Sequence, residues 1–200
     1  MNTVFEYNPY ILEHHLTEIS DTENELLVEQ ALEANDKKRP KLRDNEFNVK
    51  MDDTDETIKL KKLFLNNCHL LFDGLVEEME QKPLFAYVSN RHSYDDYWHQ
   101  HNLTSTINGV YYAKVPDDIG SLSIIDPEDG MEKKIIPLEK HIYFLPGWML
   151  HKPNPPNSEE FRVSINIEYF SLSKPILKPD NWPSVDFEVF NRYTKRKIVW

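Results

Sequence analysis

Cysteine, basic residues and long apolar runs are all scarce in this sequence of 200 residues. Cys68 is the single cysteine, so no disulfide framework exists and a reducing compartment is expected. It lies in an apolar helical pattern. No stretch approaches the roughly 18 apolar residues of a membrane helix, and the N-terminus lacks the regions of a signal peptide. The 23 basic residues against 34 acidic ones give a net charge of −11, which disfavours nucleic acids and anionic membranes as partners. We therefore expect a cytoplasmic protein.

The N-terminal part of the chain predicts two helices and little else. Residues 1–12 form an extended segment that can add an edge strand, and a first helix starts with Asp21 or Thr22 as its cap. Residues 37–54 are charged and poor in apolar side chains, which indicates a loop. A longer helix runs from Thr54 to Pro83 and is expected to pack on the outside of the major sheet. Its predicted apolar stripe comprises Ile58, Leu63, Phe64, Leu70, Leu71, Leu75, Val76 and Met79.

After Pro83 the apolar pattern changes to a period of two, which indicates short strands separated by turns. Regular spacing of such strands favours a sandwich or a jelly roll, so the fold class is mainly β. The tail, residues 171–200, is rich in proline and looks irregular. The predicted strands are residues 84–89, 104–115, 120–126, 134–136, 141–145 and 160–170.

Three histidines form the main chemical pattern. His99 and His101 are separated by one residue, so on an extended strand both side chains point to the same side and can hold one metal ion. His151 lies 52 residues further on, and the intervening strands allow a barrel to return it to His99. Arg162 follows 11 residues after His151, where its planar guanidinium can bind an anionic ligand beside the metal.

These motifs, in this order, resemble the iron(II)- and 2-oxoglutarate-dependent oxygenases. Within that superfamily the resemblance is to a bacterial and phage branch that is distantly similar to prolyl hydroxylases, and it covers about Phe85 to Tyr169. The motifs that carry it are His99-x-His101, Asn108-Gly-Val-Tyr-Tyr112, Gly120-Ser-Leu-Ser-Ile-Ile-Asp-Pro127, Phe144-Leu-Pro-Gly-Trp-Met-Leu-His151-Lys-Pro-Asn154 and Arg162-Val-Ser-Ile165.

The resemblance implies a double-stranded β-helix, or jelly roll, over residues 84–170, with residues 1–83 as a helical extension and 171–200 as a tail. It also implies Fe(II) and 2-oxoglutarate as cofactors, O₂ as co-substrate, and hydroxylation with release of succinate and CO₂. The substrate would be a protein side chain or a small metabolite. The cell would be a bacterium or a phage-infected host, and a homodimer is compatible with the predicted edge strands.

The ligand set departs from the family pattern at one position. Where the related proteins carry a carboxylate, this sequence has His101. One interpretation is an all-histidine site of His99, His101 and His151. In a second, only one of the first two histidines binds and Asp95, Asp96 or water completes the shell. In a third, the metal site has been lost.

For 2-oxoglutarate, the resemblance implies that the far carboxylate is bound by Arg162, with a hydroxyl from Tyr112 or Tyr111 and from Ser164, which shares a strand face with Arg162. The competing interpretation of Arg162 is a surface ion pair. Its candidate partners are Glu159, Glu160 and Glu168.

Three functions are compatible with these patterns. The first is an Fe(II)/2-oxoglutarate dioxygenase. The second is a non-catalytic jelly roll with a structural or assembly role, for example in a phage, which the missing carboxylate and the acidic surface favour. The third is a three-histidine dioxygenase that oxidises its substrate without 2-oxoglutarate, and Arg162 disfavours it because that chemistry needs no carboxylate clamp.

Overall fold

The computed structural model describes residues 2–3, 11–38, 48–71, 79–81, 83–93, 98–101, 107–126 and 129–171. Two antiparallel sheets face each other. Among the described residues, no helix is long and apolar enough to cross a membrane.

The large sheet has the strand order β1-β2-β9-β6-β11-β5-β3, and β4 also pairs with β11. Its long central strand β11 pairs with β6 on one side and with β5 on the other. The bounds of these strands are β1 Asn2–Thr3, β2 Leu12–His15, β3 Asn48–Lys50, β4 Met79–Gln81, β5 Phe85–Ser89, β6 Ile107–Lys114, β9 His141–Pro146 and β11 Arg162–Ser171.

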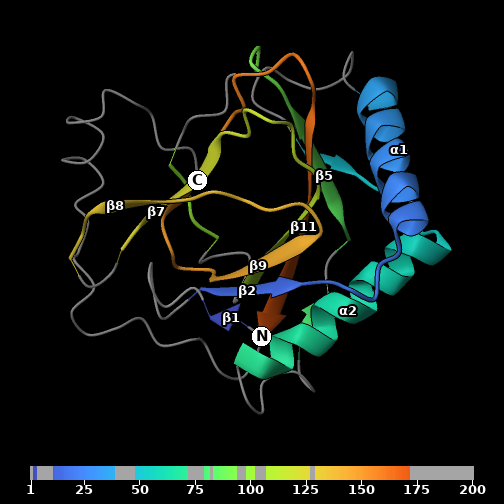
Figure 1. Cartoon of the computed structure of the whole chain (residues 1–200). Coiled ribbons are helices and arrows are strands. Elements are labelled where there is room, and N and C mark those ends of the chain that lie inside the picture. Colours follow the sequence, from blue (N-terminus) through green and yellow to red (C-terminus); the bar gives the residue numbers. More distant parts are fainter. Residues whose placement is uncertain are drawn as a thin grey trace.

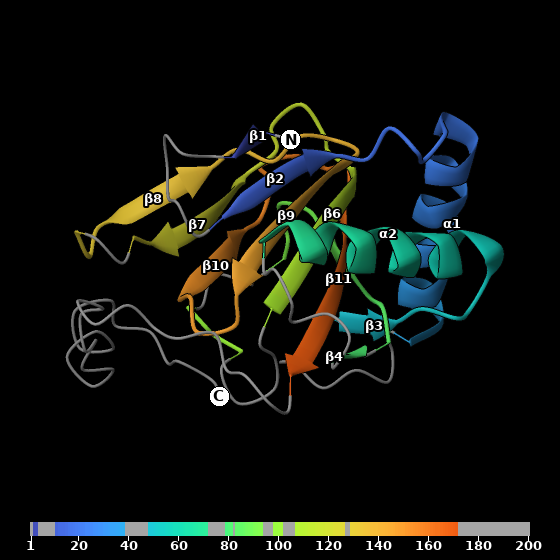
Figure 2. The same cartoon turned by 90° about the horizontal axis from the view of Figure 1, so that it is seen from below.

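The small sheet has the order β10-β7-β8. Its strands are β7 Ser121–Ile125, β8 Glu132–Ile135 and β10 His151–Asn154. The two helices, α1 at Asp21–Lys38 and α2 at Asp55–Leu71, lie on the side of the large sheet away from the small sheet (Figures 1 and 2). The molecule is mainly β, as expected, with two helices and two antiparallel sheets, an arrangement consistent with a jelly roll.

Two apolar cores follow from the alternation of side chains on β6 and its neighbours. One core lies between the helices and the large sheet and includes Phe64 of α2 and Tyr111 of β6. The other lies between the sheets and includes Tyr112 of β6 with Leu122 of β7. Consecutive tyrosines of one strand therefore belong to different cores.

Each helix begins with a reciprocal cap. At α1 the Ser20 backbone N–H donates to Glu23 at 2.8 Å, and the Glu23 N–H donates to the Ser20 hydroxyl at 3.3 Å. This is a capping box, so the prediction of Asp21 or Thr22 as the cap was wrong by one or two residues. At α2, Thr54 and Thr57 exchange backbone-to-hydroxyl bonds of 2.8 and 3.3 Å in the same way.

The predicted strands after Pro83 are all present within two or three residues of their expected ends. The prediction of one helix from Thr54 to Pro83 was wrong, because α2 ends at Leu71 and Met79 begins β4, which pairs with the end of β11. A strand pairing at the sheet edge overrides the local helical pattern there. The predicted loop at 37–54 likewise contains β3.

The N-terminal region contributes strands β1 to β4 to the large sheet as well as both helices. An edge strand from this region was expected, and β1 with β2 supplies it beside β9. The division of the chain at residue 83 stays a prediction. The tail from residue 172 onward lies outside the described residues, as do the side chains of Cys68, Leu70 and Leu71.

Candidate metal centre

The main chain brings the two histidine segments together before any side chain is considered. His99 and His151 form an isolated antiparallel bridge, in which each backbone N–H donates to the other's carbonyl at 2.9 Å. Next to this bridge, the His101 N–H donates to the Gly147 carbonyl at 2.7 Å. The predicted return of His151 to the paired histidines is therefore achieved by backbone pairing.

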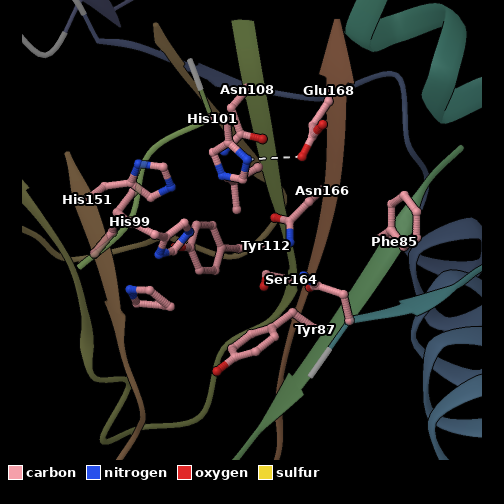
Figure 3. A pocket seen from close by; sticks show the side chains of 14 residues that line it. Phe85, Tyr87, His99, His101, Asn108, Tyr112, His151, Ser164, Asn166 and Glu168 are labelled. Carbon is pink, nitrogen blue, oxygen red and sulfur yellow. Dashed lines mark ion pairs between the residues drawn. The ribbon is translucent and has the colours of Figure 1, made fainter. Parts of the chain in front are cut away.

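The three imidazoles converge at one place. Their ligand nitrogens all lie within 4.8 Å of one another. The ring centroids are 4.3 Å apart for His99 and His151, and 5.2 Å apart for each pair that includes His101. Figure 3 shows the rings grouped at one side of a cavity. No other group of three such donors was found among the described residues.

Hydrogen bonds fix which nitrogen of two rings can bind a metal. The Nδ1 atom of His151 lies 2.8 Å from the Met149 carbonyl, which only accepts, so Nδ1 carries the proton and Nε2 keeps its lone pair. The Nδ1 atom of His101 lies 3.0 Å from Glu168 Oε1, so Nε2 is the nitrogen of this ring that can bind a metal.

The buried position of His151 keeps it neutral. Burial, followed by the neighbouring His99 and His101, lowers the pKa of His151 well below its ordinary value. A neutral imidazole is the form that coordinates metal, so the residues fit a divalent transition metal. The alternative ligands Asp95 and Asp96 lie outside the described residues.

A cavity of about 100 Å³ adjoins the histidines and lies between the two sheets. Its wall is polar along β11, where Ser164, Asn166 and Glu168 face inward at every second position (Figure 3). The remaining lining residues are Asn48, Phe85, Tyr87, His99, His101, Asn108, Val110, Tyr112, Leu122, His151 and Pro153.

Arg162 is the first residue of the same inward face of β11, but its side chain is buried and bound to backbone carbonyls. It is 1% exposed, and its Nη1 donates to the carbonyls of Asn154 at 2.8 Å and Ile119 at 3.3 Å. Its Cζ lies 5.9 Å from the centroid of the Tyr112 ring, which lines the cavity. The guanidinium therefore stands behind the Tyr112 end of the cavity.

The competing interpretation placed Arg162 in a surface ion pair with one of three glutamates. Each of these glutamates has another partner in the structure. Glu159 pairs with Arg91, Glu160 approaches Lys114 at 3.9 Å, and Glu168 pairs with His101.

The two predicted tyrosines point in opposite directions. Tyr112 lines the cavity opposite Ser164 of β11; burial raises its pKa, against a smaller lowering by Arg162. Tyr111 points toward α1, where its hydroxyl donates to Asn24 Oδ1 at 2.8 Å. The suggestion that Tyr111 contacts 2-oxoglutarate was therefore wrong, because neighbouring residues of a strand face opposite sides.

Sequence reasoning missed the inward residues Asn166 and Glu168, treating Glu168 only as a partner for Arg162. The signal was available: counting by twos from Arg162 gives Ser164, Asn166 and Glu168 on one face. Asn108 and Tyr87 were also missed as lining residues. Tyr87 lies outside the motifs, and Asn108 opens one of them but was not assigned to the cavity. Both come from strands whose position beside the cavity depends on the sheet order.

No family model matches the sequence, and no curated protein matches it. Solved structures do match its fold. A prolyl-4-hydroxylase from Pseudomonas putida aligns with a TM-score of 0.57 at 13% identity, covering 81% of this chain and 92% of that one. A prolyl hydroxylase from Trichoplax adhaerens, solved with a peptide fragment of hypoxia inducible factor, aligns at 0.62 and 13%, covering 81% and 84%.

A third matching structure is an enzyme with a different reaction. The non-heme α-ketoglutarate-dependent epimerase of nogalamycin biosynthesis aligns with a TM-score of 0.60 at 10% identity, covering 84% of this chain and 80% of that one. Similarity at these identities concerns the fold. The chain thus shares the fold of these three enzymes, and its three histidines lie at the edge of its own cavity.

Proposed function

We propose that this protein is an Fe(II)- and 2-oxoglutarate-dependent dioxygenase that hydroxylates a protein side chain or a small metabolite. One observation carries the proposal: three histidine nitrogens converge within 4.8 Å at the edge of a cavity, inside a fold that related oxygenases share. The bacterial or phage origin, the cytoplasmic location and a homodimeric state stay predictions.

In this proposal His99, His101 and His151 hold the iron. When bound, the iron would allow O₂ to react with 2-oxoglutarate, so that one oxygen atom enters succinate with release of CO₂ and the other hydroxylates the substrate. The protein's own task is to present three neutral nitrogens and to keep the site dry. Burial keeps His151 neutral, and the hydrogen-bond acceptors at Nδ1 of His151 and His101 leave Nε2 of each ring as the atom that can bind the metal.

The far carboxylate of 2-oxoglutarate is assigned to the end of the cavity near Arg162. Ser164 and Tyr112 face each other across paired strands there, and the Arg162 guanidinium lies beside the Tyr112 ring. A buried positive charge attracts an anion strongly because little water screens it. The Ser164 hydroxyl can donate directly to the carboxylate.

A second candidate is a three-histidine dioxygenase that acts without 2-oxoglutarate. The observation that favours it is the position of Arg162, whose Nη1 already donates to two backbone carbonyls, while the cavity lining contains no lysine or arginine among the described residues. This candidate needs the iron site alone, so the two functions differ in their response to 2-oxoglutarate.

The test is a set of anaerobic thermal melts of metal-free protein with Fe(II), with 2-oxoglutarate, and with both. A ligand at a hundredfold excess over its Kd stabilises the folded state by about 2.7 kcal/mol, which raises Tm by roughly 5–10 °C for a chain of this size. His151→Ala should abolish the response to iron. Arg162→Lys should weaken only the further response to 2-oxoglutarate.

His92→Ala is the matched control, because His92 is an exposed histidine that pairs with Glu159 away from the cavity. It should behave as the wild type. If Fe(II) raises the Tm of the wild type and 2-oxoglutarate adds no further increase, the result would support the three-histidine dioxygenase. A wild-type protein that responds to neither ligand would contradict both enzymatic functions and favour a non-catalytic jelly roll.

A further inference from the structure

The three-histidine site contains no carboxylate among its ligands, yet a carboxylate lies directly behind one of them. Glu168 Oε1 is 3.0 Å from His101 Nδ1, and both side chains are 21% exposed. In the resemblance drawn from the sequence, His101 occupies the position at which the oxygenases carry a carboxylate ligand. The negative charge that is missing from the ligand position is therefore present one hydrogen bond further out.

The position of Glu168 follows from the sheet. It lies on β11 opposite Asn108 of β6, and it shares the inward face with Ser164 and Asn166. Figure 3 shows its carboxylate turned toward the His101 ring rather than out of the cavity. At about 3.3 Å per residue, it stands roughly 20 Å along the strand from Arg162. The inward face of β11 thus carries a positive group at one end and a negative group at the metal end.

We infer that Glu168 is the charge-compensating carboxylate of this metal centre and the positioning residue for His101. This inference rests on the proposed function, because it assigns a role toward the iron held by the three histidines. By accepting a hydrogen bond from Nδ1–H, Glu168 holds the ring with Nε2 toward the other two histidines. Its negative charge also makes the imidazole a stronger electron donor to the metal.

A surface ion pair is the alternative explanation of the same contact. In that case the contact would support the fold alone and would have no effect on metal binding. The geometry favours the ligand role, because the ring centroid of His101 lies 5.2 Å from those of both His99 and His151.

The experiment compares metal binding by wild-type protein, Glu168→Gln and Glu168→Ala. Metal-free protein is titrated anaerobically with Co(II), whose visible absorption reports the number and geometry of its ligands, and then with Fe(II). Removal of a partner that orients a ligating histidine typically weakens metal binding by about 10- to 100-fold, which is the expected result for Glu168→Ala. Glu168→Gln retains an acceptor oxygen but not the charge, so it should lose less affinity and keep the Co(II) spectrum.

Glu160→Gln is the matched control. Glu160 is an exposed glutamate just before β11, and it lies near Lys114 rather than near the histidines. It should bind Co(II) as the wild type does. Thermal melts of the metal-free variants separate a change in the site from a change in folding.

A second comparison uses His101→Asp, which returns the carboxylate to the ligand position. In that background Glu168 has no imidazole to orient, so Glu168→Gln should change Co(II) affinity by less than about twofold, in contrast to its effect in the wild type. Equal losses in both backgrounds would contradict the role toward His101.

The outcomes separate this inference from the proposed function. A wild-type protein that binds neither Co(II) nor Fe(II) overturns both. A wild-type protein that binds them, with both Glu168 variants unchanged in affinity and spectrum, overturns the role of Glu168 and leaves the three-histidine site intact.

Discussion

Replacing Gly109 with alanine tests how α2 supports the strand that lines the cavity. Gly109 lies in β6 between Asn108 and Val110, which both line the cavity, while its own position faces α2. A Cβ atom there would lie 2.7 Å from Phe64 Cε1 and 3.1 Å from Phe144 Cε1. Carbon atoms pack best at about 3.5–4.0 Å, so one ring must move by nearly 1 Å.

The sign of the effect depends on whether that movement is possible. Alanine in a strand is favoured over glycine by about 0.5–1 kcal/mol, whereas overpacking a core costs about 1–3 kcal/mol. Phe64 and Phe144 are both fully buried and form an edge-to-face pair at 6.0 Å, which leaves little room to relax. We therefore expect Gly109→Ala to lower the free energy of unfolding by about 1–2 kcal/mol, measured by urea denaturation.

A double-mutant cycle identifies the cause. In a Phe64→Leu background the space is released, so Gly109→Ala should become neutral or stabilising by up to about 1 kcal/mol. Ile58→Leu is the control on the same helix, because Ile58 is 41% exposed and lies away from β6. If Gly109→Ala destabilises the protein equally in all three backgrounds, the close packing of α2 on β6 is not the reason.

Three further predictions concern stability and the metal. Hydrogen bonds from Lys59, the larger effect, and from Ser20 lower the pKa of Glu23 to about 2. The stability that these bonds give above about pH 4.5 should therefore be lost as the pH falls toward 2. In Glu23→Gln the midpoint of urea denaturation should depend less on pH across that window. Asn24→Ala removes the partner of the Tyr111 hydroxyl and of the Ala113 carbonyl, both at 2.8 Å, and should lower the free energy of unfolding by about 1–3 kcal/mol in urea denaturation. Chelator treatment of iron-loaded protein should lower its Tm, reversibly on returning Fe(II), and His99→Ala should show no such difference.

The six strands predicted after Pro83 and the convergence of the histidines were predictable because each depends on local rules, whereas β10, which begins at His151, was not predicted. Alternating apolar residues and turn residues mark strands, and a His-x-His pair on extended backbone faces one side. The return of His151 followed from the expected barrel. The structure adds that backbone bonds between His99 and His151 produce it.

The errors arose where distant pairing decides the local structure. Met79 fits a helical stripe but is held in β4 by β11, and nothing in the segment itself reveals that partner. Tyr111 and Tyr112 could not be assigned to faces until the register of β6 was known, because a shift of one residue exchanges the two sides. The role of Glu168 depended on which strand would lie beside His101.

The reciprocal hydrogen bonds between His99 and His151 involve only backbone atoms, so the position of these two segments does not depend on the side chains that would bind the metal. The frame that brings the two segments together uses only peptide groups, which every residue but proline offers in full. Single substitutions of the side chains at these positions can therefore leave the backbone pairing intact. Metal affinity and reactivity become adjustable by single substitutions, and a histidine in place of a carboxylate is the kind of exchange that such a frame tolerates.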